Sequence, residues 1–325
     1  MQRRPHVNRA LATRMAARTD GELPELSRPE ALAAVASIRL AALRAGPLAV
    51  TYSALAGVPA SRIAVIDRRT WALAALRMID EVLEPLPMTA RPAGLRRAVV
   101  GAGYGTAGGL ALGFVGRHLL GQFDAFSADP CLLLLAPNIV EHERRHGLDA
   151  EDFRLWVAVH EQTHAVQLSA APWLREHLLD RLAGIVVDEP GVRDMLEGLS
   201  LGRGLQGVMA SSAGRAALDE ITATMTLLEG HADFVADTAG ADHVPSVRRL
   251  RGLFSRAGGP NRLGRLLPTM DKGSQYRDGL AFCRRVAARA GRAGLAEAFS
   301  SPGNLPTPAE IAEPESWVRR VHGQA

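Results

Sequence analysis

The pattern of apolar residues predicts a long, largely buried helix from about residue 149 to 168. Asp149 can cap its first turn, because an Asp side chain accepts a hydrogen bond from the backbone N–H of the third helical residue, here Asp152. The apolar positions are Phe153, Leu155, Trp156, Val157, Val159, Ala165, Val166 and Leu168. The helix is expected to stop within Ser169-Ala170-Ala171-Pro172, since proline inside a helix costs it a hydrogen bond.

Four other segments carry the periodicity or the caps of helices. A second apolar pattern runs from about residue 216 to 238 and includes Ile221, Met225, Leu228 and Val235. An Ala/Leu-rich helix is predicted over 28–44, with Ser27 as its cap, Pro29 in its first turn and Glu30 completing a capping box. Helices are also expected over 67–83 and 281–299.

One short apolar run predicts a strand. Residues 131–136 follow Asp129-Pro130 and precede Pro137, so both ends are marked by residues that break regular structure. Because helices dominate the rest, the expected fold class is α+β, predominantly helical, with a small sheet. Two units are expected, an N-terminal helical region over 1–60 and a main domain over 61–325, which can also form one continuous unit.

Composition narrows the class of protein. The 325 residues are 47% hydrophobic and 5% aromatic, which excludes general disorder and favours helices over an all-β architecture. The net charge of +4 is modest, and without a basic stripe interleaved with aromatics no nucleic-acid partner is expected. Cys131 and Cys283 are isolated, as in proteins of a reducing compartment. Because the first residues lack the apolar core of a secretory signal, a cytoplasmic location is expected.

The segment 98–116 has no charged residue, and two functional interpretations of it compete with a structural one. Gly103-Tyr-Gly105-Thr-Ala-Gly108 matches G-x-G-x-x-G, but no convincing strand precedes it and no β-α-β series follows, so a dinucleotide site is rejected. The 19 residues could cross a bilayer, although seven glycines make them only mildly hydrophobic. The favoured interpretation is a helix buried in the core, and no membrane partner is expected.

The chemistry is concentrated in His160-Glu161-Gln162-Thr163-His164, within the predicted 149–168 helix. Residues at i and i+4 lie about 40° apart around a helix, so His160 and His164 project toward one metal ion. Glu161 lies about 100° from His160, where a carboxylate can act on water beside the metal without binding it. The H-E-x-x-H pattern therefore predicts a metal site together with a general base.

A third metal ligand is sought on the second predicted helix. Glu229 and Asp233 are also i and i+4, so one carboxylate could bind the metal and the other could orient a ligating imidazole. Glu229 is the favoured third ligand and His231, which points about 200° away from it, the alternative. By themselves the two acids could equally be a solvated face. Gly230 costs a helix about 1 kcal/mol, which suggests close approach by the other helix.

These segments also carry a family resemblance. HEQTH followed by a helix-borne Glu-x-x-x-Asp resembles the gluzincin branch of the zincin metallopeptidases. More closely, the chain from roughly residue 30 to Val321 is similar to the actinobacterial zincin-like metallopeptidase type 2 family, whose members are often labelled coenzyme F420 biosynthesis-associated. The matching segments are Ala136–Val140, Phe153–Val157, His160–Gln167, Leu228–Asp233, Gly121–Asp124, Leu305–Thr307 and Pro314–Trp317.

The resemblance implies a zincin-like metallopeptidase fold, with a small sheet over the HExxH helix, and a role for each site residue. His160, His164 and Glu229 would bind Zn²⁺, Glu161 would be the catalytic base, and Asp233 would orient a ligand histidine. Tyr276, within a Lys272-x-x-Gln275-Tyr276 element, is a candidate oxyanion stabiliser, with a packed aromatic as the alternative. Zincins align extended substrates on a strand above this helix, and 131–136 is the candidate, with a buried core strand as the alternative.

Two functions follow from the sequence and the resemblance. The first is a zinc-dependent metallopeptidase-like hydrolase acting on a peptide or protein substrate, with Glu161 as general base. The alternative is a catalytically silent zinc-binding helical scaffold or binding protein associated with coenzyme F420 metabolism. Both predict zinc at His160, His164 and Glu229, and only the first predicts that hydrolysis depends on Glu161.

Overall fold

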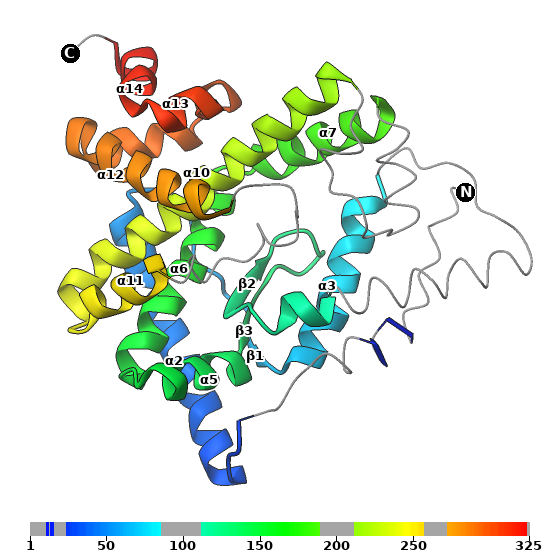
Figure 1. Cartoon of the computed structure of the whole chain (residues 1–325), viewed down its shortest axis with the longest axis vertical. Coiled ribbons are helices and arrows are strands. Elements are labelled where there is room, and N and C mark those ends of the chain that lie inside the picture. Colours follow the sequence, from blue (N-terminus) through cyan, green and yellow to red (C-terminus); the bar gives the residue numbers. More distant parts are fainter. Residues whose placement is uncertain are drawn as a thin grey trace, which may run out of the picture.

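The computed structural model describes residues 11–12, 14–15, 24–85, 112–188, 211–256 and 272–323. For residues 272–277 it describes the backbone alone. Within this part of the chain, helices surround a small sheet, as predicted (Figure 1). The long helices are α2 (Arg28–Ser53), α3 (Arg68–Leu83), α5 (Ala136–His146), α6 (Ala150–Ala170), α7 (Trp173–Asp188), α10 (Ser212–His243), α11 (Val247–Arg256) and α12 (Lys272–Ala296). The short ones are η2 (Glu297–Phe299), η3 (Pro302–Asn304), α13 (Pro308–Ala312) and α14 (Pro314–His322).

The beginnings of α2, α3 and α6 agree with the prediction within one residue, whereas α10 and α12 begin earlier than the predicted 216 and 281. Ser27 caps α2 with the expected capping box to Glu30, and the Asp67 side chain caps α3. α2 nevertheless runs nine residues past the predicted end at 44, straight through Pro47. The alanine face of this helix stays buried as far as Ala49, so packing outweighs the hydrogen bond that the proline removes.

The sheet has three strands, β1 (Ile63–Ile66), β2 (Gly121–Asp124) and β3 (Cys131–Leu135), in the order β1-β3-β2. β3 is parallel to β1 and antiparallel to β2. The apolar run at 131–136 is therefore a strand, but the prediction that it aligns an extended substrate is wrong, and the alternative of a buried core strand holds. Both of its sides are already hydrogen-bonded, which leaves β2 as the edge strand that lies beside α6.

α6 lies between α2 and α10, and β2 runs along another side of it (Figure 1). One hydrophobic core joins Ile38 of α2, Trp156 of α6 and Val235 of α10. This core includes residues from both sides of the predicted division at residue 60, and that division stays a prediction. The packing holds α6 as the central helix, with its neighbours fixed on three sides.

Only the end of the uncharged segment 98–116 falls within the described residues. Residues 112–116 are helical, and Leu112 and Val115 are buried in a core with Trp71. The G-x-G-x-x-G at 103–108 lies outside the described residues. Among the described helices, α2 alone is long and apolar enough to cross a membrane, by length and composition only.

Candidate metal centre

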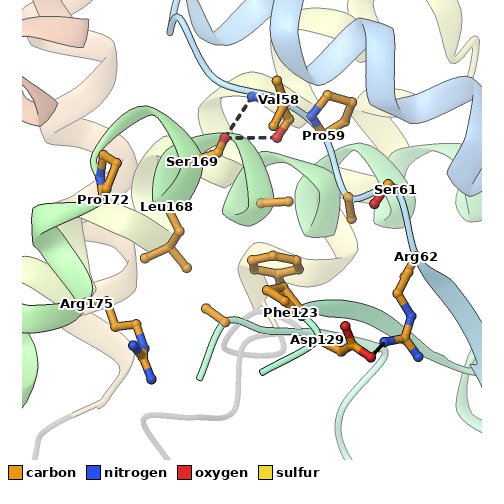
Figure 2. Close-up of a pocket in the computed structure, with 14 residues that line it drawn as sticks. Val58, Pro59, Ser61, Arg62, Phe123, Asp129, Leu168, Ser169, Pro172 and Arg175 are labelled. Atoms are coloured by element: carbon orange, nitrogen blue, oxygen red, sulfur yellow. Dashed lines mark hydrogen bonds and ion pairs between the residues drawn. The ribbon is translucent and has the colours of Figure 1, made fainter. Parts of the chain in front are cut away.

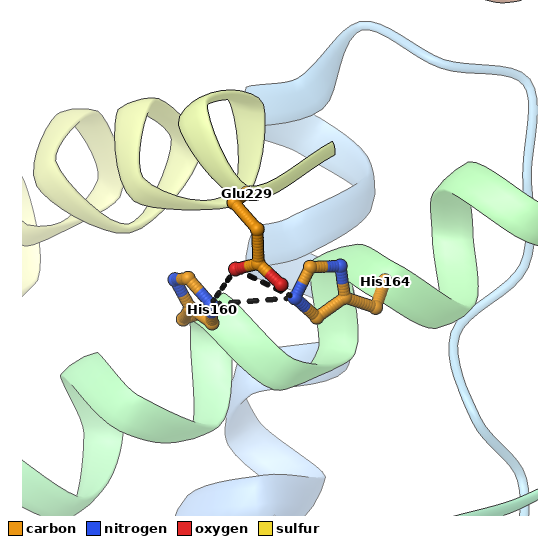
Figure 3. Close-up of side chains that lie close together, drawn as sticks. All are labelled: His160, His164 and Glu229. Carbon is orange, nitrogen blue, oxygen red and sulfur yellow. Dashed lines mark hydrogen bonds and ion pairs between the residues drawn. The ribbon is translucent and has the colours of Figure 1, made fainter. Parts of the chain in front are cut away.

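α6 brings the two histidines of HEQTH together as the helical spacing predicts. Asp149 caps it, accepting a hydrogen bond from the backbone N–H of Asp152 at 2.9 Å. One turn apart on the buried side of this helix, His160 and His164 place their Nε2 atoms 3.3 Å from each other (Figure 3). Both rings face Glu229 of α10 (Figure 3).

The residue that meets them is Glu229, the favoured candidate from the sequence. Its Oε2 lies 3.4 Å from Nε2 of His160 and 3.6 Å from Nε2 of His164 (Figure 3). Gly230 follows it, and a Cβ there would lie 2.2 Å from the backbone of Gly279. The close approach inferred from this glycine is therefore real, but the approaching helix is α12, not the HEQTH helix.

The three side chains fit a zinc ion on the evidence of their own geometry. Their ligand atoms all lie within 4.8 Å of one another. A tetrahedral zinc with bonds of about 2.0 to 2.1 Å holds its ligands about 3.3 Å apart, close to the three separations above. Oε2 of Glu229 is buried and accepts no hydrogen bond, which is costly for a carboxylate oxygen unless a cation binds it. Two imidazoles and one carboxylate are also a donor set that zinc prefers.

His160 is oriented by an ion-pair network behind it. Its Nδ1 lies 3.1 Å from Oδ1 of Asp233, and the other Asp233 oxygen accepts a hydrogen bond from Arg251 at 2.8 Å. Arg251 is itself bound by both oxygens of Asp237 and lies over the ring of Trp156. A proton on Nδ1 leaves the Nε2 lone pair for a metal, so Asp233 lies where it can orient His160, the role predicted for it.

Gln167 orients His164, as Asp233 orients His160. This role of Gln167 was not predicted from the sequence. Its amide nitrogen donates to the carbonyl of Leu228 at 2.9 Å, so its oxygen is the atom that faces Nδ1 of His164 at 3.0 Å. The same nitrogen lies 3.0 Å from Nδ1 of His231. The feature of the sequence that could have predicted this role is a glutamine three residues after His164, which shares a helix face with this histidine.

His231 is thereby excluded as the third ligand. It contacts Phe299 and faces Gln167, and it is not part of the group formed by His160, His164 and Glu229. Burial lowers the pKa of His231 to about 3, so the ring is neutral and can accept a hydrogen bond at Nδ1.

Glu161 lies on the side of α6 that faces β2. It is 5% exposed, and Gly121 packs so closely that a Cβ there would lie 2.7 Å from its Cγ and 3.0 Å from Oε1. Burial raises the pKa of Glu161, because no cation among its neighbours compensates fully for lost hydration. Its carboxylate is thus held beside the histidine pair without being part of the three-residue group.

The charges of the buried site call for a cation. Burial alone would lower the pKa of His160, but the carboxylates of Asp233 and Glu229 outweigh it and raise the pKa to about 10. Burial would raise the pKa of Glu229, but His164 and His160 lower it to about 2. Carboxylates in this small volume therefore stabilise positive charge at the two Nε2 atoms, which is where a divalent ion would bind.

The predicted Lys272-x-x-Gln275-Tyr276 element lies at the beginning of α12. Lys272, Gln275 and Tyr276 have helical backbone at the beginning of α12, and their side chains lie outside the described residues. The role of Tyr276 as oxyanion stabiliser stays a prediction.

Comparison with known proteins gives two matches. The model of a family described as zincin-like metallopeptidase matches residues 7–318. A crystal structure from Chloroflexus aurantiacus, described as "a putative hydrolase with a novel fold", superposes with a TM-score of 0.75. It is 25% identical, and the match covers 98% of this chain and 100% of that one. The search of curated proteins found no match.

Proposed function

We propose that this chain, which belongs to the zincin-like metallopeptidase family, is a zinc-dependent hydrolase that cleaves a peptide or amide bond. One observation carries the proposal. The Nε2 atoms of His160 and His164 converge with an otherwise unbonded oxygen of Glu229, and a second buried carboxyl group, that of Glu161, lies at the helical position after His160. That arrangement combines a metal site with a base, as metal-assisted hydrolysis requires.

In the proposed mechanism His160, His164 and Glu229 would hold the zinc. When bound, the ion would supply Lewis acidity, which would make water a stronger acid and the scissile carbonyl more electrophilic. Glu161 accepts a proton from the attacking water, whose oxygen forms a bond to the carbonyl carbon. The C–N bond then breaks, Glu161 passes the proton to the leaving nitrogen, and the products are a carboxylic acid and an amine.

The surroundings of Glu161 support this role. Its burial raises its pKa, which makes the carboxylate a stronger base than an exposed glutamate. The backbone of Gly121 limits the positions that the carboxylate can take. Asp233 and Gln167 fix the two imidazoles, so the ligands would need little rearrangement when the metal binds.

The test is Glu161→Gln, compared with wild type for metal content and for digestion of a peptide library. We expect stoichiometric zinc in both proteins and loss of hydrolysis in the variant, because Gln keeps the shape but cannot accept the proton. Equal digestion by both would remove Glu161 from the mechanism. Zinc without any hydrolysis would favour the silent scaffold, and absence of a divalent ion from both would refute the metal site itself.

The substrate we propose is a peptide or protein. The cytoplasmic location and the association with coenzyme F420 metabolism stay predictions from the sequence.

A further inference from the structure

A cleft of about 460 Å³ lies beside the proposed site, one helical turn beyond Glu161 (Figure 2). Its apolar walls come from the loop after α2, from β2 and from α6, and consist mainly of Val58, Pro59, Phe123, Ala165 and Leu168. Arg175 of α7 lies at one end and the Arg62–Asp129 pair at the other (Figure 2).

Two elements connect the cleft to Glu161. On α6, positions 161, 165 and 168 share one face, so Ala165 and Leu168 continue the side on which the carboxylate lies. On β2, alternate residues point to the same side, and Phe123 therefore follows Gly121, which packs on Glu161. The cleft is thus a continuation of the side of the site on which Glu161 lies.

The polar side chains of the cleft differ in how many hydrogen-bonding groups they leave for a ligand. The Ser169 hydroxyl donates to the carbonyl of Val58 and accepts from its N–H. Arg62 is paired with Asp129 at 2.6 Å, so their charges cancel. Arg175 is exposed and donates one hydrogen bond, to the carbonyl of Phe126, from a guanidinium that has five N–H groups. The net charge that the described walls offer a ligand is therefore positive and lies at the Arg175 end.

We propose that this cleft binds the leaving part of a peptide, with an apolar side chain against Phe123 and Leu168 and the peptide's terminal carboxylate on Arg175. The inference rests on the proposed function, in which Glu161 gives its proton to the leaving nitrogen, so that the segment carrying this nitrogen lies on the Glu161 side. A guanidinium is well suited to a carboxylate.

The distances limit the length of the leaving part. Leu168 lies about 10 Å beyond Glu161 along the helix, at 1.5 Å per residue. An extended chain covers about 3.3 to 3.6 Å per residue, so about three residues span the distance from Glu161 to Leu168. The enzyme would therefore remove short peptides, of about three residues or slightly more, from free carboxyl ends.

The experiment uses full-length zinc-loaded protein and pairs of peptides that differ only in a free or an amidated C-terminus. We expect wild type to cleave the free acid with about tenfold higher kcat/KM, and Arg175→Gln to lose this preference. Arg181→Gln, at an exposed arginine of the same helix, should keep it. Ser61→Trp, at an exposed position in the cleft wall, should weaken cleavage of both peptides by filling the apolar space.

A second arm measures binding of the same peptides to zinc-loaded Glu161→Gln by fluorescence anisotropy, so that the cleft is tested whether or not turnover occurs. Tighter binding of the free acid that disappears when Arg175→Gln is added supports the proposal. Equal binding of acid and amide overturns it, even if wild type hydrolyses peptides. Preferential binding without any hydrolysis by wild type would refute the proposed function and leave the cleft assignment standing.

Discussion

Gln167 sets the protonation state of His164 through contacts at both ends of its side-chain amide. Its amide oxygen faces His164, and its nitrogen is directed by the Leu228 carbonyl and by His231. Because the Leu228 carbonyl can only accept, the amide cannot turn over without losing that hydrogen bond. His164 is thereby kept with its proton on Nδ1 and its Nε2 lone pair toward Glu229.

Replacing Gln167 by Met should lower zinc affinity about 10- to 100-fold, because His164 loses the acceptor that orients it. Gln162→Met is the matched control, since Gln162 is equally buried on α6 but bonds Ala60 and Ala42 instead. Competition with a chromophoric chelator measures the affinities, and urea unfolding measures stability. Equal zinc affinity in the two variants would contradict the role of Gln167.

Gly121 acts at the other side of the site, as a positioning residue for Glu161. A Cβ at this position would lie within 3.0 Å of three Glu161 atoms, so Gly121→Ala should displace the carboxylate. Displacing a catalytic group by about 1 Å costs about 100-fold in rate, and we expect a loss of that order in kcat with zinc content unchanged. Gly184→Ala on α7, where nothing lies within 4 Å, should leave kcat unchanged. Loss of zinc from Gly121→Ala would indicate a general structural effect instead.

At the scale of elements, α10 connects the metal site to α12. It supplies Glu229 and Asp233 to α6 and, at the same turns, packs its backbone against α12. Gly230 and Gly279 are both required to be small there, because each Cβ would meet the backbone of the opposite helix. The position of Glu229 therefore depends on a helix contact on the far side of α10.

Gly230→Ala should destabilise the fold by about 1 to 3 kcal/mol, since its Cβ would lie 2.2 Å from backbone atoms that cannot rotate away. Gly252→Ala on α11 has nothing within 4 Å and should gain up to about 1 kcal/mol from better helix propensity. Urea unfolding of the two variants measures both effects. A stabilised Gly230→Ala would show that the contact between α10 and α12 is looser than described.

The ion pair between α13 and α14 predicts a pH dependence of stability. Burial alone would raise the pKa of Glu310, but Arg320 and the backbone of Thr307 outweigh it and lower the pKa below 4.5. A lowered folded pKa contributes stability that is complete above the unfolded pKa and is lost as pH falls through the folded value. The contribution is therefore present at neutral pH and disappears in acid.

Glu310→Gln should accordingly be less stable than wild type by about 1 to 2 kcal/mol near neutral pH, and the difference should shrink below pH ~4. Urea unfolding at several pH values measures it. Glu297→Gln, at an exposed acid of η2, is the control and should show no such trend. If the difference in stability grew as the pH fell, the pKa of Glu310 would not be lowered by folding, and the stabilising role of its pair with Arg320 would be refuted.

At the scale of the molecule, the metal site joins helices that are far apart in the chain. α6 and α10 are separated by α7 and by residues outside the described part, and the two sets of ligands meet only in the folded protein. Zinc that binds the native state alone stabilises it by mass action. The ion would therefore stabilise the contact between two segments of the core as well as supply the chemistry.

Free zinc at 100 times its Kd should stabilise the protein by about 2.7 kcal/mol and raise Tm by roughly 5 °C. Differential scanning calorimetry with and without a chelator measures the shift. The double variant His160→Ala, His164→Ala should show none, because two of its three ligands are gone. An equal shift in this variant would place the stabilising zinc elsewhere.

The sequence by itself determined the features that depend on neighbours along the chain. The Ser27, Asp67 and Asp149 caps and the shared face of His160 and His164 follow from backbone hydrogen bonding and from the 3.6-residue turn. Helical spacing also made Glu229 the better candidate and put His231 on another face. The family resemblance agreed with the match over residues 7–318.

Only the tertiary structure decided which segments meet. It put β3 in the middle of the sheet and β2 at the edge beside Glu161, assigned the tight contact of Gly230 to α12, and brought Gln167 between two histidines. It also assembled the cleft at Arg175 from segments with no common sequence pattern. The physical reason is that strand order and helix packing follow from burial of apolar surface across the whole chain, whereas periodicity and caps report only on the nearest turn.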